Sequence, residues 1–429
     1  MPPATVLDIA ALPSLKALGF TGGRDSFRAF CKTAFERDEL RFLASDSGDL
    51  VVFRHADLKA LAVLPEIGAV PPGVLFAGVP GPSPDGSPGL GQGIADVISN
   101  QVFTANPPIH GPVRRVLQAQ LSPRQIALME APARAVIEGI LASFADGDTI
   151  DLVQDVAEQL AVRFWGGLIG MTPDELTDAA HAVKGMTALF VLDRTLDDIV
   201  KADNSTRRYG ELVEAAALRS LASGGNPMLN ALAADLAAVD LPDAPATAGV
   251  VPPNVGKLLA GNLVDAFHTA ALGAANVTYT LLRHSDVLPQ IAADPALLGP
   301  AVMEALRLEP PVIFLNRFAL GDVEYDGHII RAGTSIAMMW GAGNHDPAAF
   351  SEPGHFRMTR SHQGLTTFGM GQHLCPGRSA AVMLAKVLIE GIAASGITFA
   401  FDEAASSWLG NLAMNQLKAM PLTVRRPAS

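Results

Sequence analysis

Hydrophobic residues along the chain recur mostly at helical spacing, which predicts a protein built mainly of α-helices. The segment 24–37 is a short example, because its apolar residues fall on one face of a helix. The longest segment, 258–282, is apolar almost throughout, as expected of a helix buried within protein. The other predicted helices cover residues 55–62, 110–120, 123–145, 152–169, 173–192, 204–222, 298–308 and 378–394.

Strand-like runs occupy three shorter stretches. Residues 40–53 predict a hairpin, because Asp-Ser-Gly-Asp supplies turn chemistry between two apolar runs. Further strands are expected within 312–339 and within 397–424. The segment 64–93 is rich in proline and glycine, and 341–371 has little periodicity, so both are expected to be irregular.

The composition narrows the class of protein. With 429 residues, 49% of them hydrophobic, the chain can bury a large core. Its net charge of −12 disfavours nucleic-acid binding, which needs a cationic surface. Residues 1–15 show no targeting signal, and Asp265 and His268 in the long apolar segment disfavour a membrane span. Two cysteines, Cys31 and Cys375, make no disulfide framework, so we expect a cytoplasmic protein.

The strongest chemical signal is FGMGQHLCPG, residues 368–377. Gly369 and Gly371 permit unusual backbone angles and a close approach to a flat group. Cys375 stands just before the predicted helix 378–394, where the helix dipole and free N–H groups favour a thiolate. A thiolate is the form required of a strongly electron-donating axial ligand of iron. The alternatives are an ordinary buried cysteine and a nucleotide-binding glycine loop, although the spacings of the latter are absent.

This segment resembles the F-x-x-G-x-(H/R)-x-C-x-G heme-binding signature of the cytochrome P450 family, matched at Phe368, Gly371, His373, Cys375 and Gly377. The resemblance implies heme b as the cofactor and Cys375 as the axial ligand of its iron. It also implies that Phe368 packs beside the sulfur, that Gly369 belongs to the heme-binding loop, and that His373 hydrogen-bonds a heme propionate.

The implied fold is mainly α with small β-sheets. In the cytochrome P450 fold, a triangular α-rich domain joins a smaller β-rich region, and the heme lies between two long helices. The chain 1–429 is then a single heme domain. Residues 1–23 would be an N-terminal extension, and 64–105 a flexible loop over the active site.

A second motif agrees with the resemblance. Glu304 and Arg307 stand three residues apart on one helical face, where they can pair. Taken alone, such a pair is commonly an exposed ion pair of little energetic value. In the family it is the structural E-x-x-R pair, which binds an arginine further along the chain. Arg357, in HFRMTR, is the best match for that arginine.

Three more residues match the family's propionate-binding positions. His110 and Arg114 lie one helical turn apart in NPPIHGPVRR, and Arg317 follows the E-x-x-R helix. An arginine suits this role because its planar fork of donors matches a carboxylate.

The long apolar helix departs from the family pattern. Alignment places DAFHT, 265–269, on the (A/G)-G-x-(D/E)-T motif, so that Thr269 matches the threonine that orders water near dioxygen. His268 replaces the acid, Ala266 the glycine and Asp265 a small residue. We hypothesise that His268 or Asp265, together with Thr269, relays protons. The alternatives are that Asp265 contacts a polar or cationic substrate group, and that His268 is an ordinary core histidine.

By analogy with the family, the substrate pocket is lined by mostly apolar side chains, which favours a hydrophobic substrate. These residues are Val97, Phe103, Phe190, Ala266, Ile313, Phe314 and Met414.

The resemblance implies a monooxygenase that inserts one oxygen atom from dioxygen into a hydrophobic organic substrate. Electrons are expected from separate proteins, a ferredoxin and its NAD(P)H-linked reductase. Arg114, Arg115, Arg124 and Arg378 are candidates for a basic docking face, although heme is expected to engage Arg114. Because of DAFHT, the alternative is a peroxygenase, a nitric oxide reductase or an isomerase-like enzyme. A non-catalytic heme-binding or sensing protein is a third class.

Overall fold

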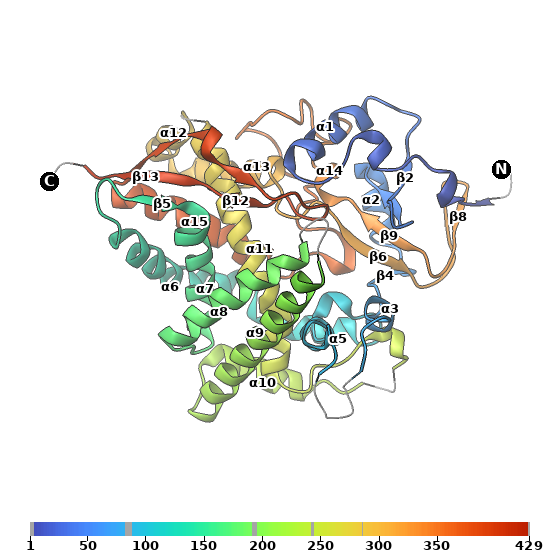
Figure 1. The fold of residues 1–429 in the computed structure, drawn as a ribbon, viewed down its shortest axis with the longest axis horizontal. Helices are drawn as coiled ribbons and strands as arrows, with labels where there is room; N and C mark the ends of the chain where they lie inside the picture. Colours follow the sequence, from blue (N-terminus) through green and yellow to red (C-terminus); the bar gives the residue numbers. More distant parts are fainter. Residues whose placement is uncertain (1–3, 82–87, 191–194, 242–243, 285, 428–429) are drawn as a thin grey trace. The chain divides into compact units, whose positions relative to one another are not determined.

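A computed structural model describes residues 4–81, 88–190, 195–241, 244–284 and 286–427. The chain divides into two compact units, and many of their elements are labelled in Figure 1. The β-rich unit comprises Met1–Val70, Pro295–Cys375 and Trp408–Gln416. The helical unit comprises Pro71–Asp294, Pro376–Ser407 and Leu417–Ser429.

The β-rich unit contains short helices and most of the strands. Its helices are α1 (Arg24–Phe35), α2 (His55–Leu61), α13 (Leu298–Leu308) and α14 (Trp340–Gly343). Its strands are β1 (Thr5–Val6), β2 (Phe42–Ala44), β3 (Leu50–Val52), β4 (Ile67–Gly68), β6 (Leu315–Ala319), β7 (Val323–Tyr325), β8 (His328–Ile330) and β9 (Ser335–Met338).

A five-stranded sheet of order β2-β3-β9-β6-β4 organises this unit, and a smaller sheet has the order β1-β8-β7. Strands β2 and β3 are antiparallel, with Phe42 opposite Val52, which confirms the predicted hairpin. Successive side chains on a strand point to opposite faces, so each face has its own core. Leu43 and Val51 belong to the cluster that contains side chains of α1, whereas Phe42 and Val52 belong to the cluster that contains Leu58 of α2.

The helical unit contains the longer helices. These are α3 (Pro72–Leu75), α4 (Gln92–Ile98), α5 (His110–Gln120), α6 (Pro123–Ala142), α7 (Glu158–Leu168), α8 (Pro173–Met186), α9 (Leu196–Ala222), α10 (Pro227–Ala237), α11 (Val255–Arg283), α12 (Val287–Ala293) and α15 (Arg378–Ser395). A three-stranded sheet is formed by β10 (Thr398–Phe401), β13 (Pro421–Arg425) and β5 (Thr149–Asp151), in that order. The remaining strands are β11 (Ser407–Trp408) and β12 (Leu417–Ala419).

Helix α11 is the predicted long apolar helix, and it packs against α9, α15 and α7. Most of its residues are buried, which explains why its sequence lacks a polar face. Its first turn is capped by Asn254, whose side-chain oxygen accepts a hydrogen bond from the amide of Lys257 at 2.9 Å. Among the residues that the structure describes, none of the helices has the length and apolar character needed to cross a bilayer.

Helix boundaries differ from the predictions where local capping or short helices were overlooked. Helix α9 begins at Leu196, eight residues before the predicted start, because Thr195 and Asp198 form a capping box. Helix α10 was not predicted, although Asn226 caps its first turn. The segment 64–105 contains β4, α3 and α4, so it is irregular only in part. The predicted helix 173–192 continues as α8 and a 3-10 turn to Phe190, and its last two residues lie outside the described ranges.

Candidate active site

The loop between Phe368 and Cys375 is closed by its own backbone. The amide nitrogen of Cys375 donates to the carbonyl oxygen of Phe368 at 2.9 Å. Gly369 and Gly371 have φ angles of +69° and +67°, a region that favours glycine. A Cβ atom on Gly371 would lie 2.0 Å from the carbonyl oxygen of Ala62, so no larger residue fits there. Gly369 and Gly371 therefore allow the backbone conformation of this loop.

The two cysteines occupy different environments. Cys375 is partly exposed, and α15 begins three residues later, at Arg378. Cys31, on α1, is only 5% exposed, and burial raises the pKa of its thiol well above the ordinary value. Only Cys375 therefore combines an accessible sulfur with a position just ahead of a long helix.

A buried hydrogen-bond network supports the cysteine loop. The side-chain oxygen of Asn344 accepts from the amide and the hydroxyl of Thr366, at 2.8 and 2.9 Å. The side-chain nitrogen of Asn344 donates to the Thr367 hydroxyl at 2.8 Å, and that hydroxyl donates to the carbonyl of Leu306 at 3.0 Å. Sequence reasoning missed these residues, because nothing in the segment 341–371 marks which polar side chains are buried.

The E-x-x-R pair is fully buried and is not the exposed pair considered as its alternative. Arg307 donates from two nitrogens to the two carboxylate oxygens of Glu304, both at 2.9 Å. Arg307 also donates to the carbonyl oxygens of Asn344 at 2.9 Å and of Pro353 at 2.7 Å. The pair thereby joins α13 to the network beneath the cysteine loop.

The arginine that completes this cluster is Arg360, which corrects the assignment to Arg357. The Nε atom of Arg360 donates to Glu304 at 3.0 Å, and its side chain is 7% exposed. The guanidinium of Arg357 instead pairs with the exposed Glu352, and only its backbone amide reaches Glu304, at 3.0 Å. Both arginines lie in HFRMTR, so their spacing alone did not identify which one turns inward. His362 also contacts Glu304, at 3.2 Å.

Arg317, on β6, is a buried cation that pairs with no anion among the described residues. It is 5% exposed, and its guanidinium donates a hydrogen bond to the carbonyl oxygen of its neighbour Asn316, at 3.2 Å. No carboxylate of the described residues forms an ion pair with it, and burial lowers the pKa of its guanidinium to about 10. A buried guanidinium of this kind favours an anionic partner, and a heme propionate would be a suitable one.

His110 and Arg114 lie on α5 of the helical unit, as predicted. His110 is the first residue of the helix and is 3% exposed. Arg114 is partly exposed, and its guanidinium lies 3.1 Å from the side-chain amide of Gln118, one turn further along. The two residues are one helical turn apart on α5, so both can serve a single anionic group.

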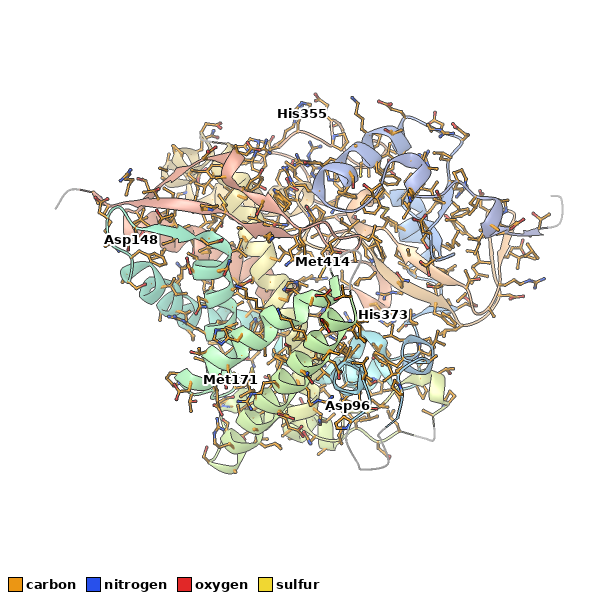
Figure 2. The ribbon with its side chains drawn as sticks, viewed as in Figure 1. Asp96, Asp148, Met171, His355, His373 and Met414 are labelled. Atoms are coloured by element: carbon orange, nitrogen blue, oxygen red, sulfur yellow. The ribbon has the colours of Figure 1, made fainter. Side chains whose placement is uncertain are left out.

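His373 ends the 3-10 turn η8 (Gly371–His373), within the cysteine loop (Figure 2). In the β-rich unit, the structure thus brings Phe368, Gly369, His373 and Cys375 into one short loop.

The segment 265–269 lies in the middle of α11, and its polar residues are held in place. The hydroxyl of Thr269 donates to the carbonyl oxygen of Asp265 at 2.7 Å. Burial raises the pKa of Asp265 to about 6, although a hydrogen bond from Gln101 acts in the opposite direction. Burial lowers the pKa of His268 to about 4, so its imidazole is neutral at pH 7. Gln101 was not found from the sequence, because it belongs to no motif.

The predicted pocket residues differ in exposure. In the helical unit, Val97 of α4 is 5% exposed, whereas Phe103 and Ala266 are partly exposed. The side chain of Phe190 lies outside the described part of the structure.

In the β-rich unit, Phe314 is partly exposed. Ile313 is completely buried in the hydrophobic core beside α1, so it supports this region and does not line an accessible surface. Met414 (Figure 2) is 6% exposed and pairs with Val312 in an antiparallel bridge.

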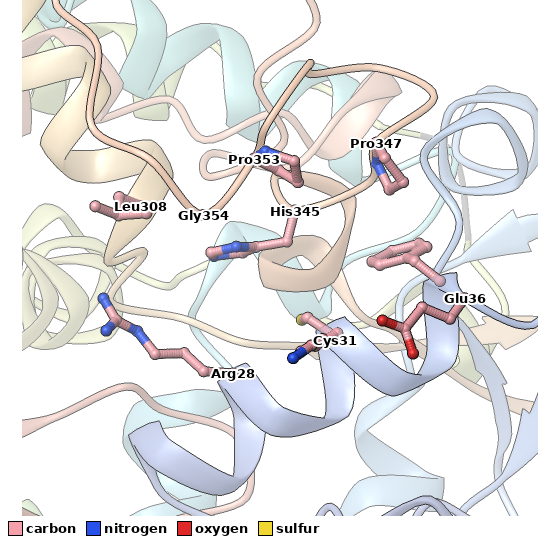
Figure 3. A pocket seen from close by; sticks show the side chains of 10 residues that line it. Arg28, Cys31, Glu36, Leu308, His345, Pro347, Pro353 and Gly354 are labelled. Carbon is pink, nitrogen blue, oxygen red and sulfur yellow. The ribbon is translucent and has the colours of Figure 1, made fainter.

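A separate cavity of about 350 Å³ lies in the β-rich unit (Figure 3). Its lining includes Arg28 and Cys31 of α1, and His345. It contains none of the residues predicted to bind heme or substrate, so it is distinct from the site described above.

These donors fit an iron porphyrin. A partly exposed cysteine offers a thiolate, and Arg317 offers a buried cation for a propionate. Comparison with known proteins agrees with this chemistry. The cytochrome P450 family model matches residues 295–392, which include α13 with its E-x-x-R pair and the cysteine signature.

Relatives with named activities are similar over most of the chain. The C-19 steroid 1alpha-hydroxylase of Sorangium cellulosum is 27% identical over 66% of this chain and 71% of its own length. Cytochrome P450 monooxygenase PikC of Streptomyces venezuelae is 26% identical over 77% of each chain.

Solved structures show the same fold. The crystal structure of CalO2 has a TM-score of 0.78 at 20% identity, covering 93% of this chain and 96% of that one. P450BioI, solved in complex with a fatty-acyl-ligated acyl carrier protein, has a TM-score of 0.76 at 19% identity and covers 92% and 97%. The fold and the cysteine signature define a heme-thiolate oxygenase. The family-model match and the relatives support a cytochrome P450 protein, a monooxygenase whose cofactor is heme b.

Proposed function

We propose that this enzyme inserts one oxygen atom from dioxygen into a hydrophobic organic substrate, with Cys375 as the axial thiolate of the heme iron. The observation that supports it best is the closed loop from Phe368 to Cys375, which carries a partly exposed cysteine just ahead of α15. When bound, the heme supplies the iron chemistry that activates dioxygen.

The chain's own residues would hold the cofactor. Arg317 and Arg114 would bind heme carboxylates, because each presents a guanidinium fork. His110 and His373 would add hydrogen bonds to the same groups. The buried Glu304–Arg307 pair acts at a distance from the chemistry, by fixing the network beneath the cysteine loop.

Proton delivery is assigned to α11. Thr269 is anchored to the carbonyl of Asp265, and a hydroxyl in this position can order water. His268 is neutral at pH 7 because burial lowers its pKa to about 4, so it can accept a proton and pass it on. We assign the relay to Thr269 with His268 or Asp265.

We further propose that a ferredoxin and its NAD(P)H-linked reductase supply the electrons, and that the enzyme works in the cytoplasm. Arg115, Arg124 and Arg378 of the helical unit are exposed and form no ion pair in the described part of the structure. Such cations suit an acidic electron-transfer protein. The apolar residues Val97 and Ala266 favour a hydrophobic substrate.

Absorption spectroscopy of the reduced protein with carbon monoxide tests the thiolate assignment. Wild-type protein and Cys31→Ser should both show the red-shifted band typical of thiolate ligation. Cys375→Ser should lose that band even when its heme content is restored. A red-shifted band that survives Cys375→Ser, or that is absent from fully heme-loaded wild-type protein, would overturn the proposal.

Turnover assays distinguish the proposed reaction from its alternative. DAFHT in place of the common motif, with a histidine at the acid position, is the observation that favours a peroxide-driven enzyme. The monooxygenase proposal predicts product with ferredoxin, reductase and NAD(P)H. Product with hydrogen peroxide alone, and none with the electron-transfer proteins, would favour the peroxygenase.

A further inference from the structure

Asp265 is the only acidic residue of α11, and it lies in the middle of a helix that is otherwise mostly apolar. Its side chain is exposed, yet protein atoms crowd it closely enough to raise the pKa of the carboxyl to about 6. A carboxyl group with that pKa is still mainly ionised at pH 7.5. Asp265 therefore presents a negative charge on an exposed side chain that protein atoms crowd, where a cationic ligand can reach it.

The described residues around Asp265 provide a hydrogen bond but no cation. The amide nitrogen of the Gln101 side chain donates to Oδ2 of Asp265 at 3.3 Å. Tyr209 of α9 is fully buried, and its hydroxyl has no hydrogen-bond partner in the described part of the chain. Burial raises the pKa of Tyr209, and the charge of Asp265 raises it further. Both neighbours are polar, but neither neutralises the carboxylate.

Three cations of the neighbouring helices are already engaged. Each of three basic residues on α9 and α11 has a carboxylate partner within 3.0 Å. The pairs are Lys257 with Glu214, Arg207 with Asp203, and Arg283 with Glu403. None of the described cations forms an ion pair with Asp265, so its carboxylate is available to a cationic ligand.

The position of Asp265 is fixed by a rigid contact with the segment around Gln101. The amide nitrogen of Val102 donates to the side-chain oxygen of Asn262 at 3.1 Å, and the side-chain nitrogen of Asn262 donates to the carbonyl of Asn100 at 3.2 Å. Gly261 allows this approach, since a Cβ there would lie 2.7 Å from the Asn100 backbone. Gln101 is 2% exposed, so its amide is held in place before any ligand arrives.

We propose that Asp265, held by Gln101, binds the protonated amine of the substrate, so that the enzyme accepts organic cations with an apolar body. This inference rests on the proposed function, because it assigns the substrate class of the same site. An amine is favoured over a hydroxyl, because a hydroxyl would leave the charge of the carboxylate uncompensated. Asp265 then serves specificity, and His268 with Thr269 keeps the proton relay.

The test compares two probes that differ only in charge. Benzyltrimethylammonium is a cation that cannot coordinate iron, and neopentylbenzene is its neutral carbon isostere. Dissociation constants are measured with heme-loaded wild type, Asp265→Asn and Asp265→Glu, by calorimetry and by heme absorbance at pH 7.5. We expect Asp265→Asn to weaken the cation about tenfold or more, whereas the neutral probe changes by less than about threefold. Asp265→Glu should retain most of the preference.

Three outcomes overturn the inference. Wild-type protein fails to bind the cation at millimolar concentration, Asp265→Asn weakens both probes equally, or it weakens neither. If Asp265→Asn does not fold, the affinities of wild type and of Asp265→Glu for the two probes still test the inference. The carbon monoxide spectrum of each preparation separates this result from the proposed function. A normal red-shifted band without cation preference rejects only the inference, whereas a missing band in wild-type protein rejects the thiolate assignment.

Discussion

The Nε atom of Arg360 lies 3.0 Å from Oε1 of Glu304, at a carboxylate that is completely buried. Arg360→Ala would leave part of this charge uncompensated, although Arg307 and His362 would remain. We expect a loss of about 2–3 kcal/mol in the free energy of unfolding. Arg357→Ala, which removes an exposed pair, should cost less than about 1 kcal/mol. Denaturation of the heme-loaded variants checks this, and the reverse order would restore Arg357 as the buried partner.

The sequence did not distinguish Arg360 from Arg357, but it was sufficient to predict several helices and the cysteine loop. The hydrophobic pattern predicted α1, α11, α13 and α15 closely, because each buries a long apolar face. The signature placed Cys375 in its loop because the spacing of glycines constrains the backbone locally.

The remainder depended on tertiary contacts, which single-sequence patterns do not encode. Arg357 and Arg360 lie three residues apart in the same segment. Only the fold decides that Arg360 contacts the buried Glu304 whereas the Arg357 side chain pairs with the exposed Glu352. Asn344 and Gln101 become important through partners far away in the chain. Analogy with the family placed Ile313 in the pocket lining, but its side chain is completely buried in the hydrophobic core beside α1.

Acid should weaken the buried cluster around Glu304. Burial alone would raise the pKa of Glu304, but hydrogen bonds from His362 and Arg307 outweigh it and lower the pKa to about 2. A lowered carboxyl pKa contributes stability that is present above pH 4.5 and is lost as pH falls toward 2. The contribution at neutral pH is roughly 3 kcal/mol. Unfolding curves of wild type and Glu304→Gln between pH 7 and 3 should converge. A constant gap between them would contradict this prediction.

Glu158, the first residue of α7, should behave in the opposite way. Burial raises its pKa to about 7, with Asp151 and Asp155 adding to the shift and Lys184 opposing it. A raised carboxyl pKa contributes stability that is present below pH 4.5 and is lost as pH rises through 7. Glu158→Gln should therefore stabilise the protein by about 2 kcal/mol at pH 8 and by little at pH 4.5. The same gain at both pH values would show that its pKa is ordinary.

The two cysteines should differ in reactivity. In heme-free protein, a thiol reagent at pH 8 should modify Cys375 quickly, because its side chain is partly exposed. Cys31 is 5% exposed and burial raises its pKa, so it should react only when the protein unfolds. Bound heme should protect Cys375 from modification. Mass spectrometry of labelled peptides identifies the site, and fast labelling that persists in Cys375→Ser would assign it to Cys31.

The last prediction concerns proton delivery by α11. Because burial lowers the pKa of His268 to about 4, its imidazole is neutral from pH 5 to 8, and a relay through it should show no inflection in that range. A relay through Asp265, with a pKa of about 6, should instead change near pH 6. We expect Thr269→Ala and His268→Ala to lower the fraction of electrons recovered in product at least about tenfold, with hydrogen peroxide released instead. Thr269→Ser, which keeps the hydroxyl, is the matched control. If neither variant alters coupling and an inflection near pH 6 disappears in Asp265→Asn, the relay belongs to Asp265.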